Sequence, residues 1–128
     1  MPPTVIVIDD SHALTQVVSE FLTLNSIDVL AVGQNGKEAV ELYKKHSPDF
    51  VLMDYLMPEF NGLYGLQNIR KTNPNAKVIM FTGSADPGLF DQFRESGVFA
   101  ILEKPCEFDK LVETINNTPS SNTVQLTS

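Results

Sequence analysis

Short apolar runs alternate with longer amphipathic stretches along most of the chain. Each run has four to six residues, and most runs are continuous rather than alternating with polar residues. This pattern is typical of strands that are buried on both faces of a parallel sheet. The pattern predicts strands at Thr4–Ile8, Ile27–Val32, Phe50–Met53, Val78–Phe81 and Val98–Leu102.

The segments between these runs carry helical signals. Apolar residues recur at helical spacing between Ala13 and Leu22. Asn35 and Glu38 have the spacing of a capping box, and Gly97 is expected to cap the end of the fourth helix. The other helical stripes are Leu63, Leu66 and Ile69; Leu89, Phe90 and Phe93; and Phe108, Leu111, Val112 and Ile115.

Five strands that alternate with five helices define the fold class. Parallel strands joined by helices require right-handed crossovers, which place helices on both faces of the sheet. We therefore predict an α/β fold, a single doubly wound (βα)5 sandwich with a five-stranded parallel sheet, over residues 1–117. Residues 118–128 are polar and are expected to form a flexible C-terminal tail.

Composition and charge exclude several classes of protein. The 128 residues carry a formal charge of −7, which opposes attraction to phosphate backbones, so no direct nucleic-acid partner is expected. The single cysteine, Cys106, excludes an internal disulfide and is expected to be a small packing residue. No apolar run approaches the roughly 20 residues of a membrane helix, and the N-terminus lacks the features of a secretory signal. A cytoplasmic protein without membrane insertion is expected.

Polar residues that can bind ligands or take part in a reaction follow four of the predicted strands. Asp9 and Asp10 follow the first strand, Asp54 the third, Thr82 the fourth and Lys104 the fifth. Ligands bind beyond the carboxyl ends of the strands in such sheets, so these side chains are expected to converge. Three carboxylates repel one another and favour a hard cation, for which Mg²⁺ fits best. With a lysine and a hydroxyl nearby, the site suits a phosphoryl group that is accepted by one carboxylate.

These residues and their surroundings resemble the receiver domain of two-component response regulators. The resemblance implies a flavodoxin-like topology and a stand-alone switch similar to the single-domain chemotaxis regulators. It also implies that Asp54 accepts a phosphoryl group from a sensor histidine kinase or phosphotransfer protein, and that a downstream protein target reads the change. The resemblance extends from about Val5 to Ile115 and rests on Val-Ile-Asp9-Asp10-Ser, Asp54-Tyr-Leu-Met-Pro58-Glu-Phe-Asn-Gly62, Phe-Thr82-Gly83 and Lys104-Pro105.

The resemblance further assigns ligands for the cation. Asp10, Asp54 and the backbone carbonyl of Leu56 are expected to bind Mg²⁺ directly, with Asp9 acting through water. Gly62 is expected to permit the turn after Pro58.

The phosphoryl group itself is assigned other contacts by the resemblance. Lys104 is expected to pair with its oxygens, and Thr82 to hydrogen-bond one of them. The bond between Lys104 and Pro105 is expected to be cis, which proline makes accessible.

Two positions depart from the common receiver pattern. Many receivers carry Tyr or Phe three residues before the lysine, where this chain has Ile101. Ile101 is either a packing residue or shares signalling with Phe99, which lies two residues earlier on the same predicted strand face. Together with Phe90 and Phe93 these residues make up the expected switch and partner face. Leu56, two residues after Asp54, cannot orient a water molecule, which predicts slow loss of the phosphoryl group.

Two alternative functions remain open from the sequence. The first is a receiver-like interaction module that works without phosphorylation. The second is an aspartyl-phosphate phosphatase of the haloacid dehalogenase type, which needs a second Asp where this chain has Leu56. No turnover enzyme is expected, and the protein is expected to be a monomer or weak dimer.

Overall fold

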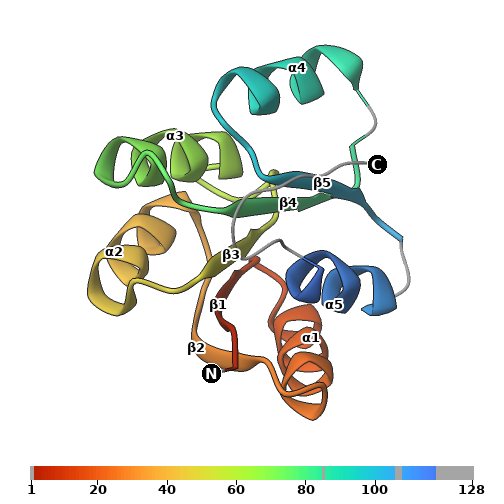
Figure 1. Cartoon of the computed structure of the whole chain (residues 1–128). Coiled ribbons are helices and arrows are strands. Elements are labelled where there is room, and N and C mark those ends of the chain that lie inside the picture. The colour runs from red at the N-terminus through yellow and green to blue at the C-terminus, as the bar shows by residue number, and fades with distance from the viewer. Residues whose placement is uncertain (1, 85, 106–107, 118–128) are drawn as a thin grey trace.

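Five strands alternate with five helices in the computed structural model, which describes residues 2–84, 86–105 and 108–117 (Figure 1). The elements are β1 (Thr4–Ile8), α1 (His12–Leu24), β2 (Asp28–Gly33), α2 (Gly36–His46), β3 (Phe50–Met53), α3 (Gly62–Thr72), β4 (Val78–Thr82), α4 (Pro87–Glu95), β5 (Ala100–Glu103) and α5 (Phe108–Asn116). The predicted alternation is thereby confirmed.

The strands form one parallel sheet with the order β2-β1-β3-β4-β5. Helices α1 and α5 cover one face, and α2, α3 and α4 lie on the other (Figure 1). The chain starts at β1, next to the β2 edge; it then forms β2 at that edge and crosses back over β1 to add β3, β4 and β5. This is the doubly wound α/β sandwich that the sequence predicts, and its carboxyl edge is where ligands bind.

Alternate residues of each central strand pack into two separate hydrophobic cores, one on each face of the sheet. In β3, Val51 and Met53 pack with α2, α3 and α4, whereas Phe50 and Leu52 pack with α1 and α5. All four of these residues are buried. Burial on both faces explains why the strands read as continuous apolar runs in the sequence.

Two strands begin later than the apolar runs that predicted them. At the end of α1, the Ile27 amide donates to Leu22 O and the Ser26 amide to Thr23 O. At the end of α4, the Val98 amide donates to Phe93 O and the Gly97 amide to Arg94 O. Both pairs form a Schellman motif, which assigns the first apolar residue of each run to the preceding helix end.

The Schellman motifs differ in the residue that adopts the left-handed conformation. Gly97 has φ +87°, as expected for a helix cap, whereas Ser26 has φ 64° at the corresponding position after α1. A residue with a Cβ is strained in this region, and glycine is not. The sequence signal for a helix end is therefore present at Gly97 and missing at Ser26.

The start of α2 carries the predicted cap with one change. Asn35 Oδ1 accepts a hydrogen bond from the Glu38 amide at 2.9 Å. Glu38 Oε1 accepts from the Gln34 amide at 2.8 Å, one residue before the position that a capping box uses. The cap still joins the end of β2 to α2 through two hydrogen bonds.

Two expectations fall on parts of the chain outside the described residues. These are the packing role of Cys106 and the flexible tail at residues 118–128. Among the described residues, no helix has the length and apolarity needed to cross a membrane.

Candidate functional site

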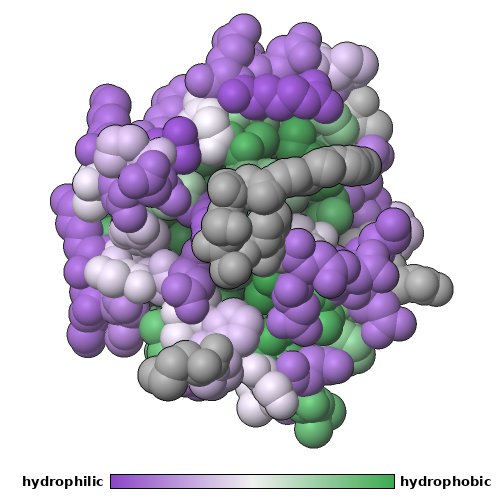
Figure 2. All heavy atoms as spheres, viewed as in Figure 1, coloured by the Kyte–Doolittle hydropathy of each residue, from purple (hydrophilic) through white to green (hydrophobic). Residues whose placement is uncertain are grey.

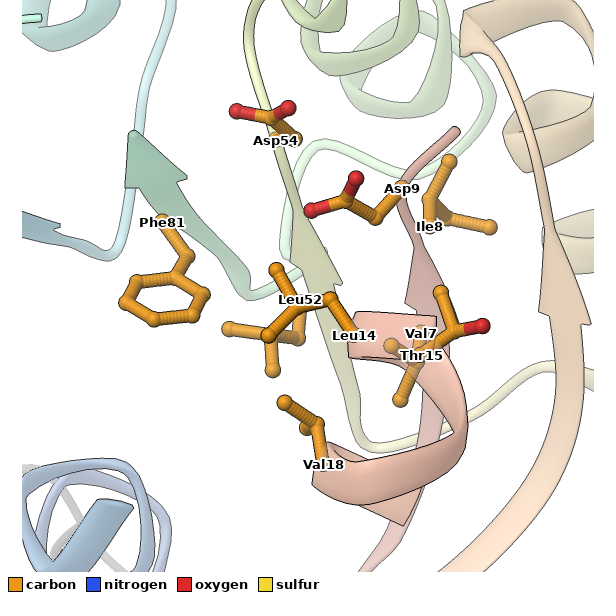
Figure 3. Close-up of a pocket in the computed structure, with 9 residues that line it drawn as sticks. All are labelled: Val7, Ile8, Asp9, Leu14, Thr15, Val18, Leu52, Asp54 and Phe81. Carbon is orange, nitrogen blue, oxygen red and sulfur yellow. The ribbon is translucent and has the colours of Figure 1, made fainter. Parts of the chain in front are cut away.

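Three carboxylates meet at the carboxyl edge of the sheet. The Asp54 amide donates to Ile8 O at 2.9 Å, which fixes the end of β3 beside the end of β1. Figure 3 shows the side chains of Asp9 and Asp54 side by side above these two strand ends. One carboxylate oxygen from each of Asp9, Asp10 and Asp54 lies within 4.8 Å of the other two. The structure thus brings together the three acids that the sequence singled out.

Lys104 reaches into this acidic cluster from the end of β5. Its Nζ lies 2.9 Å from Asp9 Oδ2 and 3.6 Å from Asp54 Oδ2. The same ammonium group lies 5.2 Å from the centre of the Phe81 ring, a cation–π distance. The Lys104 amide donates to Thr82 O at 2.7 Å, and the peptide bond to Pro105 is cis, as expected. The lysine is therefore held by its backbone on one side and by two carboxylates on the other.

Backbone amides donate hydrogen bonds to three side-chain oxygens of the site. Asp9 Oδ1 accepts from the Ser11 amide at 3.0 Å, and Asp54 Oδ1 accepts from the Tyr55 amide at 2.8 Å. Thr82 Oγ1 accepts from the Ser84 amide at 3.2 Å, which leaves its hydroxyl proton free to donate. These three amide donors cannot be found from the sequence, because a backbone N–H is present at nearly every residue and carries no residue-type signal.

Burial and neighbouring charge raise the pKa of Asp54 above the ordinary value of 3.8. Desolvation is the largest cause, and the nearby carboxylates of Asp9 and Asp10 add to it. Lys104 and the hydrogen bond from the Tyr55 amide act in the opposite direction without cancelling the effect. Only 9% of Asp54 is exposed, so its negative charge is poorly solvated. A cation beside it would favour the ionised form.

The glycine after Pro58 has a different role from the one predicted. The turn is made by Glu59, which has φ 67°. Gly62 is buried at the start of α3, where a Cβ would collide with the carbonyl oxygen of Asp54. Gly62 therefore allows α3 to approach the backbone of the candidate phosphoacceptor, and the Gly62 amide donates to Tyr55 O at 2.8 Å.

Leu56 follows Asp54 by two residues and has its side chain directed to solvent. It is 76% exposed, although it is a large apolar residue. The chain therefore presents an apolar side chain, rather than a polar one, two residues after Asp54.

The residues of the expected switch face do not form one surface. Ile101 is half-buried and packs with Phe90 against the core beneath α4. Phe93 is fully buried, so its role is in the core rather than at a partner surface; it contacts the Tyr55 ring edge-on at 5.6 Å.

Phe99 is not near the acidic cluster. Its amide donates to O of Val78, the first residue of β4, at the opposite edge of the sheet. Its ring contacts Phe50, which belongs to the core on the α1 and α5 side. Phe99 therefore does not share a strand face with Ile101 as predicted, because the end of α4 delays the start of β5.

The donor set of the cluster fits a hard divalent cation. It offers carboxylate oxygens from three residues, which are the ligands that Mg²⁺ prefers. The exposed carboxylate of Asp10 leaves room for water molecules, which Mg²⁺ usually retains. The carboxylate repulsion that raises the pKa of Asp54 is the kind that such an ion relieves.

Fold and site together define a class of protein, a flavodoxin-like α/β domain with an acidic pocket at its carboxyl edge. The sequence profile of the response regulator receiver domain matches residues 5–116. The chain belongs to this family of two-component signalling proteins. As such it is a signalling switch and not a turnover enzyme.

Similar proteins cover nearly the whole chain. A "Chemotaxis protein CheY" of Bacillus subtilis (strain 168) is 32% identical over 92% of this chain and 98% of its own length. A CheY of Thermotoga maritima is 32% identical over 91% of this chain and 97% of its own length. A solved CheX-CheY-BeF3-Mg²⁺ complex from Borrelia burgdorferi superposes with a TM-score of 0.85 at 27% identity, covering 90% of this chain and 87% of that one. The fold prediction is confirmed by these likenesses.

Proposed function

We propose that this chain is a phosphoacceptor switch in which Asp54 accepts a phosphoryl group from a phosphohistidine. The donor is a sensor histidine kinase or a phosphotransfer protein, the reaction depends on Mg²⁺, and the product changes the affinity for a downstream protein in the cytoplasm. One observation carries the proposal. The Asp54 carboxylate lies at the carboxyl edge of the sheet, 3.6 Å from Lys104 Nζ and within 4.8 Å of carboxylate oxygens of Asp9 and Asp10.

The transfer itself requires one nucleophile and one leaving group. A carboxylate oxygen of Asp54 attacks phosphorus, and the bond between phosphorus and the imidazole nitrogen breaks. The imidazole nitrogen keeps the electron pair, and Asp54 becomes an acyl phosphate. Water later attacks phosphorus, which restores the carboxylate and releases inorganic phosphate. The Tyr55 amide holds one Asp54 oxygen and so orients the other towards the open side.

The acids around Asp54 account for the expected cation. Asp10, Asp54 and the backbone carbonyl of Leu56 are the proposed direct ligands, and Asp9 is proposed to act through water. When bound, the ion supplies positive charge next to the carboxylates and the incoming phosphoryl oxygens. Removal of any of the three carboxylates is therefore expected to weaken cation binding.

Lys104 and Thr82 are proposed to contact the phosphoryl group. Lys104 Nζ already lies between Asp9 and Asp54, so a small movement brings it to an oxygen attached to Asp54. The Thr82 hydroxyl donates to no other group within the described part of the chain, so its proton is available to a second oxygen. These contacts would pull the ends of β4 and β5 towards Asp54, and α4 follows β4 directly in the chain.

Intact mass spectrometry tests the proposal. The full chain is incubated with acetyl phosphate and Mg²⁺, and one added phosphoryl group of about 80 Da is expected (the mass of HPO₃). The Asp54→Asn variant and a reaction with EDTA should show no gain. The Asp49→Asn variant, which changes an exposed acid away from the pocket, should be phosphorylated like wild type. No gain in wild type, or an equal gain in Asp54→Asn, would overturn the proposal.

A further inference from the structure

An open groove lies between the C-terminal half of α1 and strand β2, away from the acidic pocket. It has a volume of about 550 Å³. Figure 2 shows hydrophobic atoms at the surface at the bottom of the view, over the end of α1. We call this feature the α1/β2 groove; it is lined by Ser19, Glu20, Thr23, Leu24, Val29, Ala31 and Val32.

Apolar side chains of this groove are unusually exposed. Leu24 is 82% exposed and Val32 is 46% exposed, although both are large aliphatic residues. The floor is built on β2, which pairs only with β1 and is therefore an edge strand (Figure 1). Edge strands are commonly protected by charged residues, proline or bulges. Strand β2 contains no lysine or proline, but it begins with Asp28, and its pairing with β1 shifts register between Val5 and Ile6. The groove thus combines an apolar surface with the edge of the sheet.

The hydroxyl of Ser19 adds an unmet polar requirement at the same place. Its Oγ is buried without a hydrogen-bond partner among the described residues. Buried hydroxyls are normally paired, because an unpaired one loses its bond to water without compensation. Ser19 lines the α1 side of the groove, although its hydroxyl oxygen is not itself exposed.

The part of the chain that forms the α1/β2 groove carries charge of one sign. Residues 1–36 contain four acids and no Lys or Arg, so they account for −4 of the net charge of −7. Two of these acids belong to the acidic pocket, and the other two are Glu20 in the groove and Asp28 at the start of β2. Neither Glu20 nor Asp28 forms an ion pair within the described part of the chain.

We propose that the α1/β2 groove binds a short basic segment of a partner protein. Apolar side chains of that segment enter the groove over Leu24 and Val32, and its Lys or Arg side chains pair with Glu20 and Asp28. A second copy of this chain would bring the same acids together and is therefore disfavoured by like-charge repulsion. The groove does not include Asp54, so binding does not depend on the proposed phosphorylation.

A designed peptide probe tests this proposal by fluorescence anisotropy. The probe is a fluorescein-labelled peptide of alternating Lys and Leu, compared with peptides in which Ser replaces Leu or Glu replaces Lys. Only the Lys-Leu peptide should bind, and rising salt should weaken it. Glu20→Lys and Leu24→Ser should each weaken binding by about fivefold or more, as expected for loss of a charge pair or an apolar contact.

Matched variants separate the groove from general attraction to an acidic protein. Glu41→Lys makes the same charge change on the exposed face of α2. This variant should bind the probe within about twofold of wild type, and so should Asp54→Asn. Circular dichroism of every variant confirms that the fold is retained.

Three results would overturn the proposal. The first is no binding of the Lys-Leu peptide at millimolar concentration. The second is equal weakening by Glu20→Lys and Glu41→Lys, which would indicate attraction to net charge alone. The third is a dimer in sedimentation velocity that Leu24→Ser dissociates, which would make a second copy the occupant of the groove.

Discussion

Asp54 illustrates how a single buried charge opposes folding. Its pKa is raised in the folded protein, so folding favours the protonated form and the ionised carboxylate lowers the stability. This cost is present at neutral pH. It disappears as the pH falls through the folded pKa towards the unfolded value of 3.8, where the group is protonated in both states.

The first prediction concerns the amide variant of this residue. Without divalent cations, Asp54→Asn should raise the melting temperature at pH 7 by about 4 °C, the shift that ~1 kcal/mol produces in a domain of this size. The gain should shrink as the pH approaches 4. Thermal unfolding in EDTA from pH 4 to pH 8 measures it, with exposed Asp28→Asn as the control. A less stable Asp54→Asn at pH 7 would contradict the burial argument.

The second prediction compares two glycines near the pocket. Gly62→Ala should lower the free energy of unfolding by about 2 kcal/mol, because the new methyl group collides with the backbone at Asp54. Gly83→Ala should have little effect, since among the described residues no atom beyond its chain neighbours lies within 4 Å of the Cβ position. Urea denaturation of both variants measures the difference. Equal stabilities would mean that α3 can move away from Asp54 at little cost.

Leu56 carries the third prediction, on the lifetime of the phosphoryl group. Its exposed side chain cannot hydrogen-bond an attacking water, so the wild type should dephosphorylate slowly. Leu56→Asn or Leu56→Glu should shorten the half-life by about tenfold, a modest effect for a group that positions a reactant. Leu56→Met, which stays apolar, should leave it unchanged. The half-life is followed by intact mass after removal of the phosphodonor. An unchanged half-life in the Asn and Glu variants would defeat the idea.

At the scale of elements, helix ends decide where two strands begin. Ile27 and Val98 are apolar and stand at the head of apolar runs, yet each donates its amide to the helix before it. Strands without such a helix end, β1 and β3, have the bounds that their apolar runs predict. The amide of a hydrophobic residue after a helix can therefore bond either to that helix or to a neighbouring strand. Only the hydrogen bonds of the structure show which of the two it does.

The fourth prediction follows from the left-handed residue after α1. Ser26→Gly should raise the free energy of unfolding by about 0.5–1 kcal/mol, because glycine adopts φ 64° without the clash of a Cβ. Ser96→Gly, at the C-cap of α4, should not stabilise the protein, because Ser96 has φ −87° and is not in the left-handed region. Chemical denaturation of both variants measures the two effects. Stabilisation by both, or by neither, would show that backbone strain at Ser26 is not the cause.

The helices also show what a sequence pattern leaves out. The stripe of Leu89, Phe90 and Phe93 predicts α4, but it does not distinguish the fully buried Phe93 from the half-buried Phe90. The Phe93 ring contacts Tyr55, which lies between β3 and α3 and is far away in the sequence. Contacts of this kind depend on the packing of the whole molecule, and no local pattern encodes them.

For the whole molecule, the sequence allowed the fold and the residue types of the site to be predicted. Asp9, Asp54 and Lys104 were singled out because parallel strands bring their carboxyl ends to one edge. The prediction could not include the pairing of Lys104 with Asp9 at 2.9 Å, nor the amides that hold each carboxylate. It also placed Phe99 on the same strand face as Ile101, whereas β5 begins only at Ala100 and the Phe99 ring contacts Phe50 of the other core.

The two acidic regions of the molecule differ in whether a cationic side chain neutralises them. At the carboxyl edge, Lys104 partly neutralises the acids, whereas Glu20 and Asp28 beside the α1/β2 groove have no such partner in the described structure. High salt should therefore weaken binding at the groove more than binding of a divalent cation at the pocket.

The ion pair of Lys104 makes the lysine an intramolecular competitor for the pocket. The Lys104 ammonium group is tethered to the same chain as Asp9, so its effective concentration at that carboxylate is high. A divalent cation must displace it in order to bind there. Lys104→Met should therefore bind Mg²⁺ more tightly than wild type in calorimetric titration, while the metal-free variant melts at a lower temperature. Equal affinities would show that the ammonium does not compete. If the lysine competes, the ion pair sets a minimum cation concentration for binding. Below that concentration, Lys104 stays paired with Asp9 and the cation does not bind.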